Sequence, residues 1–331
     1  MKFGRSPNTP SLHHSISPSR LPPERDALLR TVGNTPLIPL LRLPEAHGVG
    51  SDVKIYAKAE WFNPGGSVKD RPALRMVRAA ESTGAMTPGK ILTDATSGNT
   101  GIAYAMICAR RGYRCEICLP ANASPERKQI LAAYGVNLIL TDPAQGSDGA
   151  IIEVRKRVAS DPKKYFYPDQ YSNPHNPLAH YNSTAPEIWK QTRGRITHFV
   201  AGLGTSGTIM GTGGRLKKFN KRIQIVSLQP DAAFHGLEGL KRMDSAIVPS
   251  IFNERFPDRN LDAPTEPAQA LVRELARCEG LLVGVSSGAA LWGAITIGQE
   301  LTAAKQSGGI VAIFPDSGDK YLSETFWSEN A

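Results

Sequence analysis

Long hydrophobic runs are absent from this chain of 331 residues. No apolar stretch approaches the ~18 residues that a membrane-spanning helix requires, and the first thirty residues lack the apolar segment of a secretory signal. We therefore expect no membrane association and a cytoplasmic location. The length exceeds what one hydrophobic core usually organises, which predicts two domains or one large α/β unit.

Cysteine is scarce, and no histidine spacing is typical of a metal site. The four cysteines suit a reducing compartment. Cys115 and Cys118 form a CxxC pair, nominally a redox or zinc motif. The surrounding segment 114–119 indicates a strand, on which residues three apart face opposite sides of the sheet. Since the seven histidines form no HExxH or similar pattern, we expect structural cysteines and no metal ion.

Positive charge is in excess but is spread thinly. The 39 basic and 30 acidic residues give a net charge of +9. Residues 1–25, rich in proline and serine, are predicted to be a flexible tail. One dense basic run is typical of a solvated helix end rather than of a nucleic-acid site, and it comprises Arg215, Lys217, Lys218, Lys221 and Arg222. We expect no nucleic-acid partner.

From Asp26 onward, strand-like and helix-like segments alternate at the spacing of βαβ units. This predicts an α/β fold with mostly parallel sheets covered by helices. Strands are expected at 91–92, 117–119, 136–140, 198–201, 223–228, 281–283 and 310–314. Helices are expected at 101–111, 125–134, 149–159, 207–219, 268–278 and 287–301. The turn-rich segment 172–177 is the expected crossing between two such units.

Three of the predicted strands end in a turn of Gly, Ser, Thr and Asn that opens a helix: 96–101 (TSGNTG), 202–208 (GLGTSGT) and 284–289 (GVSSGA). Ligands in open α/β sheets collect at the carboxyl ends of strands, where free N–H groups and helix dipoles favour anions. Three such turns in one chain suggest a ligand held at several points.

Two familiar motifs overlap these turns. GLGTSG matches the dinucleotide pattern GxGxxG, but the acid that should follow the next strand is missing, since Asp231 comes after a proline. The hydroxyls of Thr205, Ser206 and Thr208 suit a terminal phosphate monoester better. GVSSG matches a hydrolase nucleophile elbow, but no histidine follows Ser286, which is then a helix cap or a hydroxyl offered to a ligand.

The segment 63–72 (NPGGSVKDRP) places Lys69 at a predicted helix start. An ammonium at the positive end of a helix is destabilised, so its pKa falls and a nucleophilic amine becomes available. A phosphate cradle, an imine-forming lysine and further turns for a carboxylate together favour pyridoxal phosphate. On the residues alone, a dinucleotide site and an ordinary surface lysine stay open.

These motifs, with 28–40 (LLRTVGNTPLIPL) and 314–327 (FPDSGDKYLSETFW), resemble the cysteine synthases of the β-family of pyridoxal-phosphate enzymes and the catalytic core of cystathionine β-synthase. The resemblance implies fold type II, as in the tryptophan synthase β-subunit, with two three-layer α/β domains. Residues 60–173 would form the N-terminal domain. Residues 26–59 and 174–331 would form the C-terminal one.

The resemblance also implies a role for each site residue. Lys69 forms the imine and acts as general base, Asn99 lies beside the phenolic oxygen of the cofactor, and Ser286 faces the pyridine nitrogen. The phosphate cradle is then made by Gly204, Thr205, Ser206, Gly207 and Thr208. The substrate carboxylate site is made by Thr96, Ser97, Gly98, Thr100 and Gln170.

The activity implied is a transferase reaction, β-replacement on O-acetylserine or O-phosphoserine with a sulfide donor to give L-cysteine. The pattern is closest to the O-phosphoserine-using enzymes, in which a basic residue, here Lys241 or Arg242, meets the substrate phosphate. The alternatives are condensation of serine with homocysteine and a non-catalytic scaffold of the same fold. A homodimer is expected, with a sulfur-carrier protein or a serine acetyltransferase as candidate partner.

Overall fold

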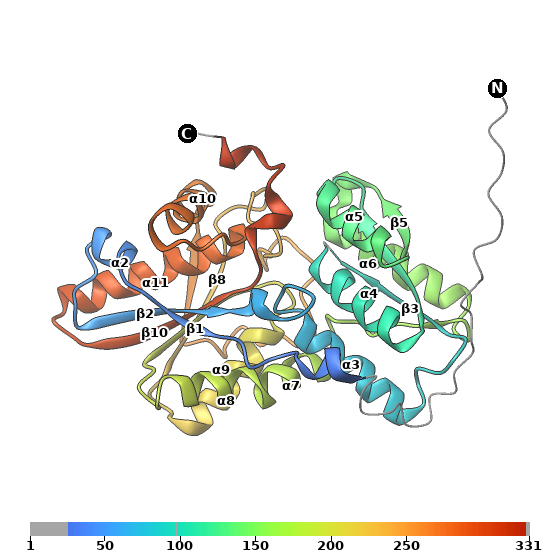
Figure 1. Ribbon diagram of the computed structural model, residues 1–331, viewed down its shortest axis with the longest axis horizontal. Coiled ribbons are helices and arrows are strands. Elements are labelled where there is room, and N and C mark those ends of the chain that lie inside the picture. The colour runs from blue at the N-terminus through green and yellow to red at the C-terminus, as the bar shows by residue number, and fades with distance from the viewer. Residues whose placement is uncertain (1–25, 97, 329–331) are drawn as a thin grey trace.

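Two β-sheets organise the protein, whose computed structural model describes residues 26–96 and 98–328 (Figure 1). The larger sheet has the strand order β1-β2-β10-β7-β8-β9, and all neighbours are parallel except β1 and β2. Its strands are β1 (Leu37–Leu40), β2 (Val53–Ala59), β7 (His198–Gly202), β8 (Gln224–Pro230), β9 (Arg259–Ala263) and β10 (Gly308–Phe314).

The smaller sheet is parallel throughout and has the order β5-β4-β3-β6. Its strands are β3 (Ile91–Ala95), β4 (Arg114–Pro120), β5 (Asn137–Thr141) and β6 (Tyr165–Phe166). Cys115 and Cys118 lie on β4 and pack into different hydrophobic clusters, so they face opposite sides of the sheet as predicted. All four cysteines are free thiols.

Helices cover both faces of the larger sheet. Alternate residues of its strands enter different cores: Val200 packs with α10 (Thr265–Glu274) and α11 (Val285–Ala303), while Phe199 packs with α8 (Thr184–Gln191) and α9 (Gly207–Phe219). Figure 1 shows these two pairs of helices above and below the sheet. Parallel strands buried on both faces account for the nearly continuous apolar composition of β7 and β10.

The smaller sheet is covered in the same way. One face packs against α3 (Asp70–Thr83), α4 (Asn99–Arg111) and α5 (Pro125–Ala133), and the other against α6 (Gly146–Ser160). The remaining helices are α1 (Ala27–Arg30), α2 (Leu43–Ala46), α7 (His175–Asn182), η2 (Glu60–Phe62), η3 (Pro143–Gln145), η4 (Leu275–Glu279), η5 (Gly318–Tyr321) and η6 (Thr325–Trp327). No helix in the described residues is long and apolar enough to cross a membrane.

The predicted α/β class is confirmed, and one expected strand is wrong. Leu281–Val283 makes only an isolated bridge, between Val283 and Ser317. Three apolar residues look alike in a strand and in a connection between other elements, and here Leu282 is exposed, which explains the error. Strands β1, β2, β6 and β9 were missed; β9 (RNLDA) is polar and lies at a sheet edge. The division into two domains stays a prediction, and the proposed tail 1–25 lies outside the described residues.

A buried cluster of charges fixes the start of α3. Arg71, in its first turn, pairs with Glu60 (2.7 Å) and Glu187 (2.7 Å), and Glu187 also pairs with Lys58 (2.8 Å). Lys58, Glu60 and Arg71 have side chains at most 2% exposed. Two carboxylates and two cations neutralise one another, and they tie β2, η2 and α8 to the helix that begins next to Lys69.

We predict that Glu187→Gln destabilises the protein by about 3–5 kcal/mol at neutral pH, the cost of removing one partner from a buried ion pair. Burial alone would raise the pKa of Glu187, but Arg71 and Lys58 hold it at about 2, below its ordinary value of 4.5. A lowered folded-state pKa stabilises the protein above about pH 4.5, and this stabilisation is lost as the pH falls toward 2.

Denaturant unfolding at pH 7 and pH 3 measures both effects. The difference between wild type and Glu187→Gln should shrink at the lower pH, whereas the exposed control Glu254→Gln should follow wild type at both. A difference that stays constant with pH would contradict the assignment.

Candidate active site

A cavity of about 690 Å³ lies where the carboxyl ends of strands from both sheets face each other, and a smaller one of about 40 Å³ adjoins it. Lys69, Asn99, Gly204 and Thr205 line both. Thr96, Thr100, Gln170, Lys241 and Arg242 line the larger cavity, and Ser206, Thr208 and Ser286 line the smaller one. Residues predicted from turns far apart in the sequence therefore meet at one place.

Lys69 is the residue immediately before α3, as the sequence predicts. The pKa of its amine is lowered, and the largest cause is burial rather than the helix end. The nearby Arg127 lowers the pKa further, while the carboxylate of Asp316 acts in the opposite direction. A lysine with a lowered pKa supplies a neutral amine able to form an imine or take up a proton.

The turn between β7 and α9 forms a tight cradle. Ser206 precedes the helix with φ +65°, and its buried hydroxyl has no hydrogen-bond partner. A Cβ on Gly204 would lie 2.6 Å from a backbone carbonyl oxygen, and a Cβ on Gly207 would collide with the side chain of Asn176. An unpartnered hydroxyl beside the N-terminus of a thirteen-residue helix suits a phosphate group.

Two residues that contact this cradle were not predicted from the sequence. Asn176 donates from Nδ2 to Thr205 Oγ1 (3.0 Å) and to the backbone oxygen of Gln170 (2.8 Å). His180 places Nε2 3.4 Å from Thr208 Oγ1, and burial lowers the pKa of His180 to about 3, so the ring is neutral. Asn176 lies in the turn-rich segment read only as a crossing, and no motif marks His180.

The TSGNTG segment turns from β3 into α4. The hydroxyl of Thr96 accepts a hydrogen bond from the backbone N–H of Gly98 (3.0 Å), and Gly98 has φ +149°, a conformation that favours glycine. Thr100 donates to Gln170 Oε1 (2.8 Å), which joins two residues predicted to hold the substrate carboxylate. Ser97, predicted for the same role, lies outside the described residues.

Asn99 and Ser286 face the smaller cavity from different sheets. Asn99 begins α4 and donates from Nδ2 to Asp316 Oδ2 (2.8 Å), while its own Oδ1 is buried without a partner. Ser286 is the second residue of α11. Since Gly284 precedes the helix, Ser286 is not its cap, and it lines the smaller cavity instead.

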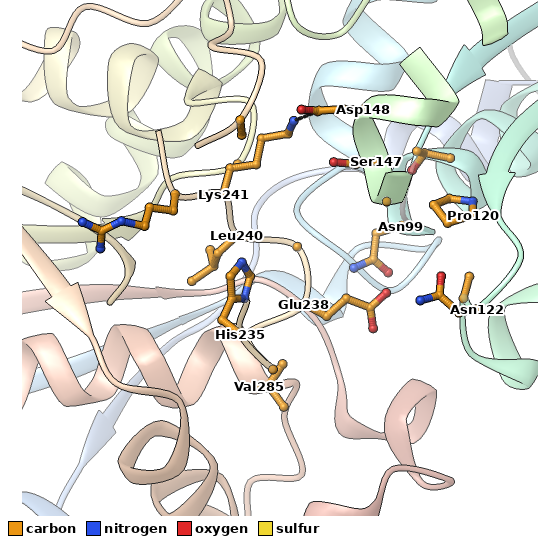
Figure 2. A pocket seen from close by; sticks show the side chains of 18 of the residues that line it. Asn99, Pro120, Asn122, Ser147, Asp148, His235, Glu238, Leu240, Lys241 and Val285 are labelled. Carbon is orange, nitrogen blue, oxygen red and sulfur yellow. Dashed lines mark hydrogen bonds and ion pairs between the residues drawn. The ribbon is translucent and has the colours of Figure 1, made fainter. Parts of the chain in front are cut away.

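The two basic residues predicted to meet a substrate phosphate differ in their surroundings. Lys241 forms an ion pair with Asp148 (2.6 Å) across the larger cavity, as Figure 2 shows, and its ammonium lies 5.1 Å from the ring centre of Tyr171. The guanidinium of Arg242 donates to the backbone oxygen of Asp231 (2.7 Å) and pairs with Asp244 (2.9 Å).

Arg127 is a lining residue that no sequence signal marked. It comes from α5, its side chain is 2% exposed, and it forms an ion pair with Glu238 from the opposite side of the cavity. Its guanidinium carbon lies 4.7 Å from the ring centre of Tyr321, and its side chain packs against Gly98. Arg127 thus joins the predicted carboxylate loop to the larger sheet.

The donor set fits pyridoxal phosphate. A buried amine with a lowered pKa, a cradle with a free hydroxyl at a helix N-terminus, and a second helix N-terminus on the other side supply groups for an aldehyde, a phosphate and a carboxylate. For a dinucleotide, the acid expected on the ribose is absent, because Asp231 is an exposed residue beyond the end of β8.

Comparison with known proteins places this chain in a family. The family described as pyridoxal-phosphate dependent enzyme matches residues 28–316. A cysteine synthase of Aquifex aeolicus (strain VF5) is 54% identical over 306 residues, covering 92% of this chain and 93% of that protein. Cysteine synthase B of Salmonella typhimurium is 44% identical, covering 92% and 97%.

Solved structures agree with the sequence comparison. The crystal structure of a cysteine synthase from Entamoeba histolytica superimposes with a TM-score of 0.86 at 33% identity, covering 99% of this chain and 95% of that one. The resemblance to cysteine synthases carried by the motifs is therefore confirmed. This chain belongs to the pyridoxal-phosphate-dependent enzymes of the cysteine synthase type.

Proposed function

We propose that the protein is a β-replacement enzyme that makes L-cysteine from O-acetylserine or O-phosphoserine and a sulfide donor. The observation that carries the proposal is the Lys69 amine, buried beside a phosphate-type cradle and a carboxylate-type loop in one cavity. Relatives named cysteine synthase, and an Entamoeba histolytica structure named O-acetyl serine sulfhydrylase isoform 3, support this reaction over others of the family.

Pyridoxal phosphate bound here supplies an electron sink for negative charge at the substrate Cα. The residues in position to use it are Lys69 and Ser286. Lys69 would hold the cofactor through its aldehyde, and its amine would serve as the general base for the substrate Cα proton. The neutral hydroxyl of Ser286 would hold the ring nitrogen without enforcing its protonation as a carboxylate would, and this would favour loss of the β-substituent over transamination.

The substrate carboxylate is assigned to the N-terminus of α4. Thr96, Gly98, Thr100 and Gln170 meet there, and the last two are fixed by their own hydrogen bond (2.8 Å). Because these groups are ordered before substrate arrives, little conformational entropy remains to be lost on binding. Ser97 is assigned to the same site from its place in the loop sequence.

The β-substituent is assigned to the part of the cavity next to Lys241. Within the described residues, the guanidinium of Arg242 is engaged by backbone oxygens, Asp244 and Asp262, whereas the Lys241 ammonium has one carboxylate partner, Asp148. A substrate phosphate would compete with Asp148 for the Lys241 ammonium. Lys241 is therefore the better candidate for recognising an anionic leaving group.

The oligomeric state and the cellular location are proposed from the resemblance to the family. We propose a homodimer in the cytoplasm, acting on small-molecule substrates. A serine acetyltransferase or a sulfur-carrier protein is the candidate protein partner. Size-exclusion chromatography with light scattering tests the dimer.

We predict that the purified protein has an absorbance band near the visible edge, and that Lys69→Ala loses both the band and at least about 10³-fold of cysteine-forming activity, as expected when the imine-forming group and general base is removed. The exposed Lys54→Ala is the matched control and should retain both. A colourless wild-type protein that binds no pyridoxal phosphate would contradict the proposal.

We predict that Lys241→Ala raises KM for O-phosphoserine about 10- to 100-fold, the value of one charged hydrogen bond, while changing KM for O-acetylserine less than about threefold. Arg242→Ala should change neither the KM for O-phosphoserine nor the KM for O-acetylserine by much. The assay pairs O-acetylserine, O-phosphoserine and serine each with sulfide and with homocysteine.

Three outcomes would contradict parts of this assignment. Equal effects of Lys241→Ala on both donors would remove Lys241 from phosphate recognition. Faster turnover of serine with homocysteine than with sulfide would replace cysteine synthesis by cystathionine synthesis. A cofactor-loaded protein inactive on every pair would indicate a scaffold.

A further inference from the structure

Asp316, the second residue after β10, is in contact with three separate parts of the site. Its backbone bridges to Ser67, two residues before Lys69. Its carbonyl oxygen accepts the N–H of Gly284 (3.1 Å), the residue that precedes α11. Its carboxylate accepts a hydrogen bond from Asn99 (2.8 Å). One fully buried residue therefore joins the lysine turn, the start of α11 and the start of α4.

The carboxylate determines which way the Asn99 amide faces. Oδ2 of Asp316 accepts from Asn99 Nδ2 and from the hydroxyl of Tyr321, each at 2.8 Å. Burial raises the pKa of Tyr321, so its hydroxyl stays protonated and donates. Since an ionised carboxylate only accepts, the NH₂ side of Asn99 must face Asp316. The second Nδ2 hydrogen and the unpartnered Oδ1 are then left for the cavity.

The side chain also contributes charge and close packing. The carboxylate of Asp316 opposes the effect of burial on the pKa of Lys69. A Cβ on Gly284 would collide with Asp316 Oδ1, an atom that has no hydrogen-bond partner. The carboxylate thus lies against the turn that carries Ser286, and Asp316 itself does not line either cavity. Its effect on a bound group must pass through its neighbours.

We propose that Asp316 is a positioning residue, whose carboxylate orients the Asn99 amide toward the cofactor ring and holds this contact across the two sheets. The inference rests on the roles proposed for Lys69 and Asn99. A merely structural role would be served by the backbone contacts to Ser67 and Gly284, which a side chain of the same or smaller size at position 316 can retain.

The test uses Asp316→Asn, which keeps the size of the side chain but offers a donor as well as an acceptor, so that the Asn99 amide is no longer held in one orientation. Three quantities are measured without substrate: the position of the visible-edge band, its dependence on pH, and the dissociation constant for pyridoxal phosphate. We expect the band to shift, its pH midpoint to fall because a negative charge near Lys69 is lost, and cofactor affinity to drop about tenfold.

Controls separate positioning from folding. Asp319→Asn, an exposed acid three residues later, should match wild type in all three measurements. Thermal unfolding of the cofactor-free proteins reports any loss of stability by itself. If Asp316→Asn does not fold, Asp316→Ser, which keeps the backbone contacts, replaces it and should give the same changes.

A double-mutant cycle with Asn99→Ala tests whether Asp316 acts through Asn99. Asp316→Asn should shift the band less in the Asn99→Ala background than in wild type. Equal shifts in both backgrounds, or a wild-type spectrum and affinity in Asp316→Asn, overturn the inference and leave the proposed function intact. A wild-type protein without the band overturns the proposed function instead.

Discussion

Burial of the Lys69 amine is the constraint on which the rest of the site depends. Taking an ammonium out of water is costly, so the group tends toward its neutral, nucleophilic form. The pKa of Lys69 stays low only if water is excluded from its amine and the side chain keeps its position. The charge cluster of Arg71, Glu60 and Glu187 meets the second condition, because it fixes the first turn of α3 to η2 and α8. The buried charge cluster thus holds Lys69 at the place where burial lowers the pKa of its amine.

The same constraint explains the use of two sheets. The phosphate-type cradle follows β7 of the larger sheet, and the carboxylate-type loop follows β3 of the smaller one. Each brings the N-terminus of a helix longer than twelve residues to the cavity. On a single sheet, two such helices would lie side by side and point the same way. Two sheets let anion sites face the amine from different directions.

The parts of the site that the sequence predicts are those with a local signature. Lys69, the Thr205 loop and the Asn99 loop each combine glycines, which permit close approach, with hydroxyl or amide side chains at a helix start. Arg127, His180 and Asp316 have no such signature, because their roles come from partners far along the chain; Asn99 and Asp316 are 217 residues apart. The main cause of the lowered pKa of Lys69 could not be predicted from the sequence either, since burial depends on tertiary packing.

The net charge of +9 invites the idea that the cavity attracts anions by its overall charge. The charged residues that line the cavity do not support this idea. Arg127, Lys241 and Arg242 are each paired with a carboxylate, so an anionic substrate exchanges one partner for another and gains only the difference. Within the described residues, Lys69 is the lining lysine or arginine without an ion pair, and burial lowers the pKa of its amine. In the proposed enzyme, the cofactor phosphate and the substrate carboxylate would then be recognised by hydroxyls and backbone N–H groups in fixed geometry, and a substrate phosphate would gain Lys241 only by displacing Asp148.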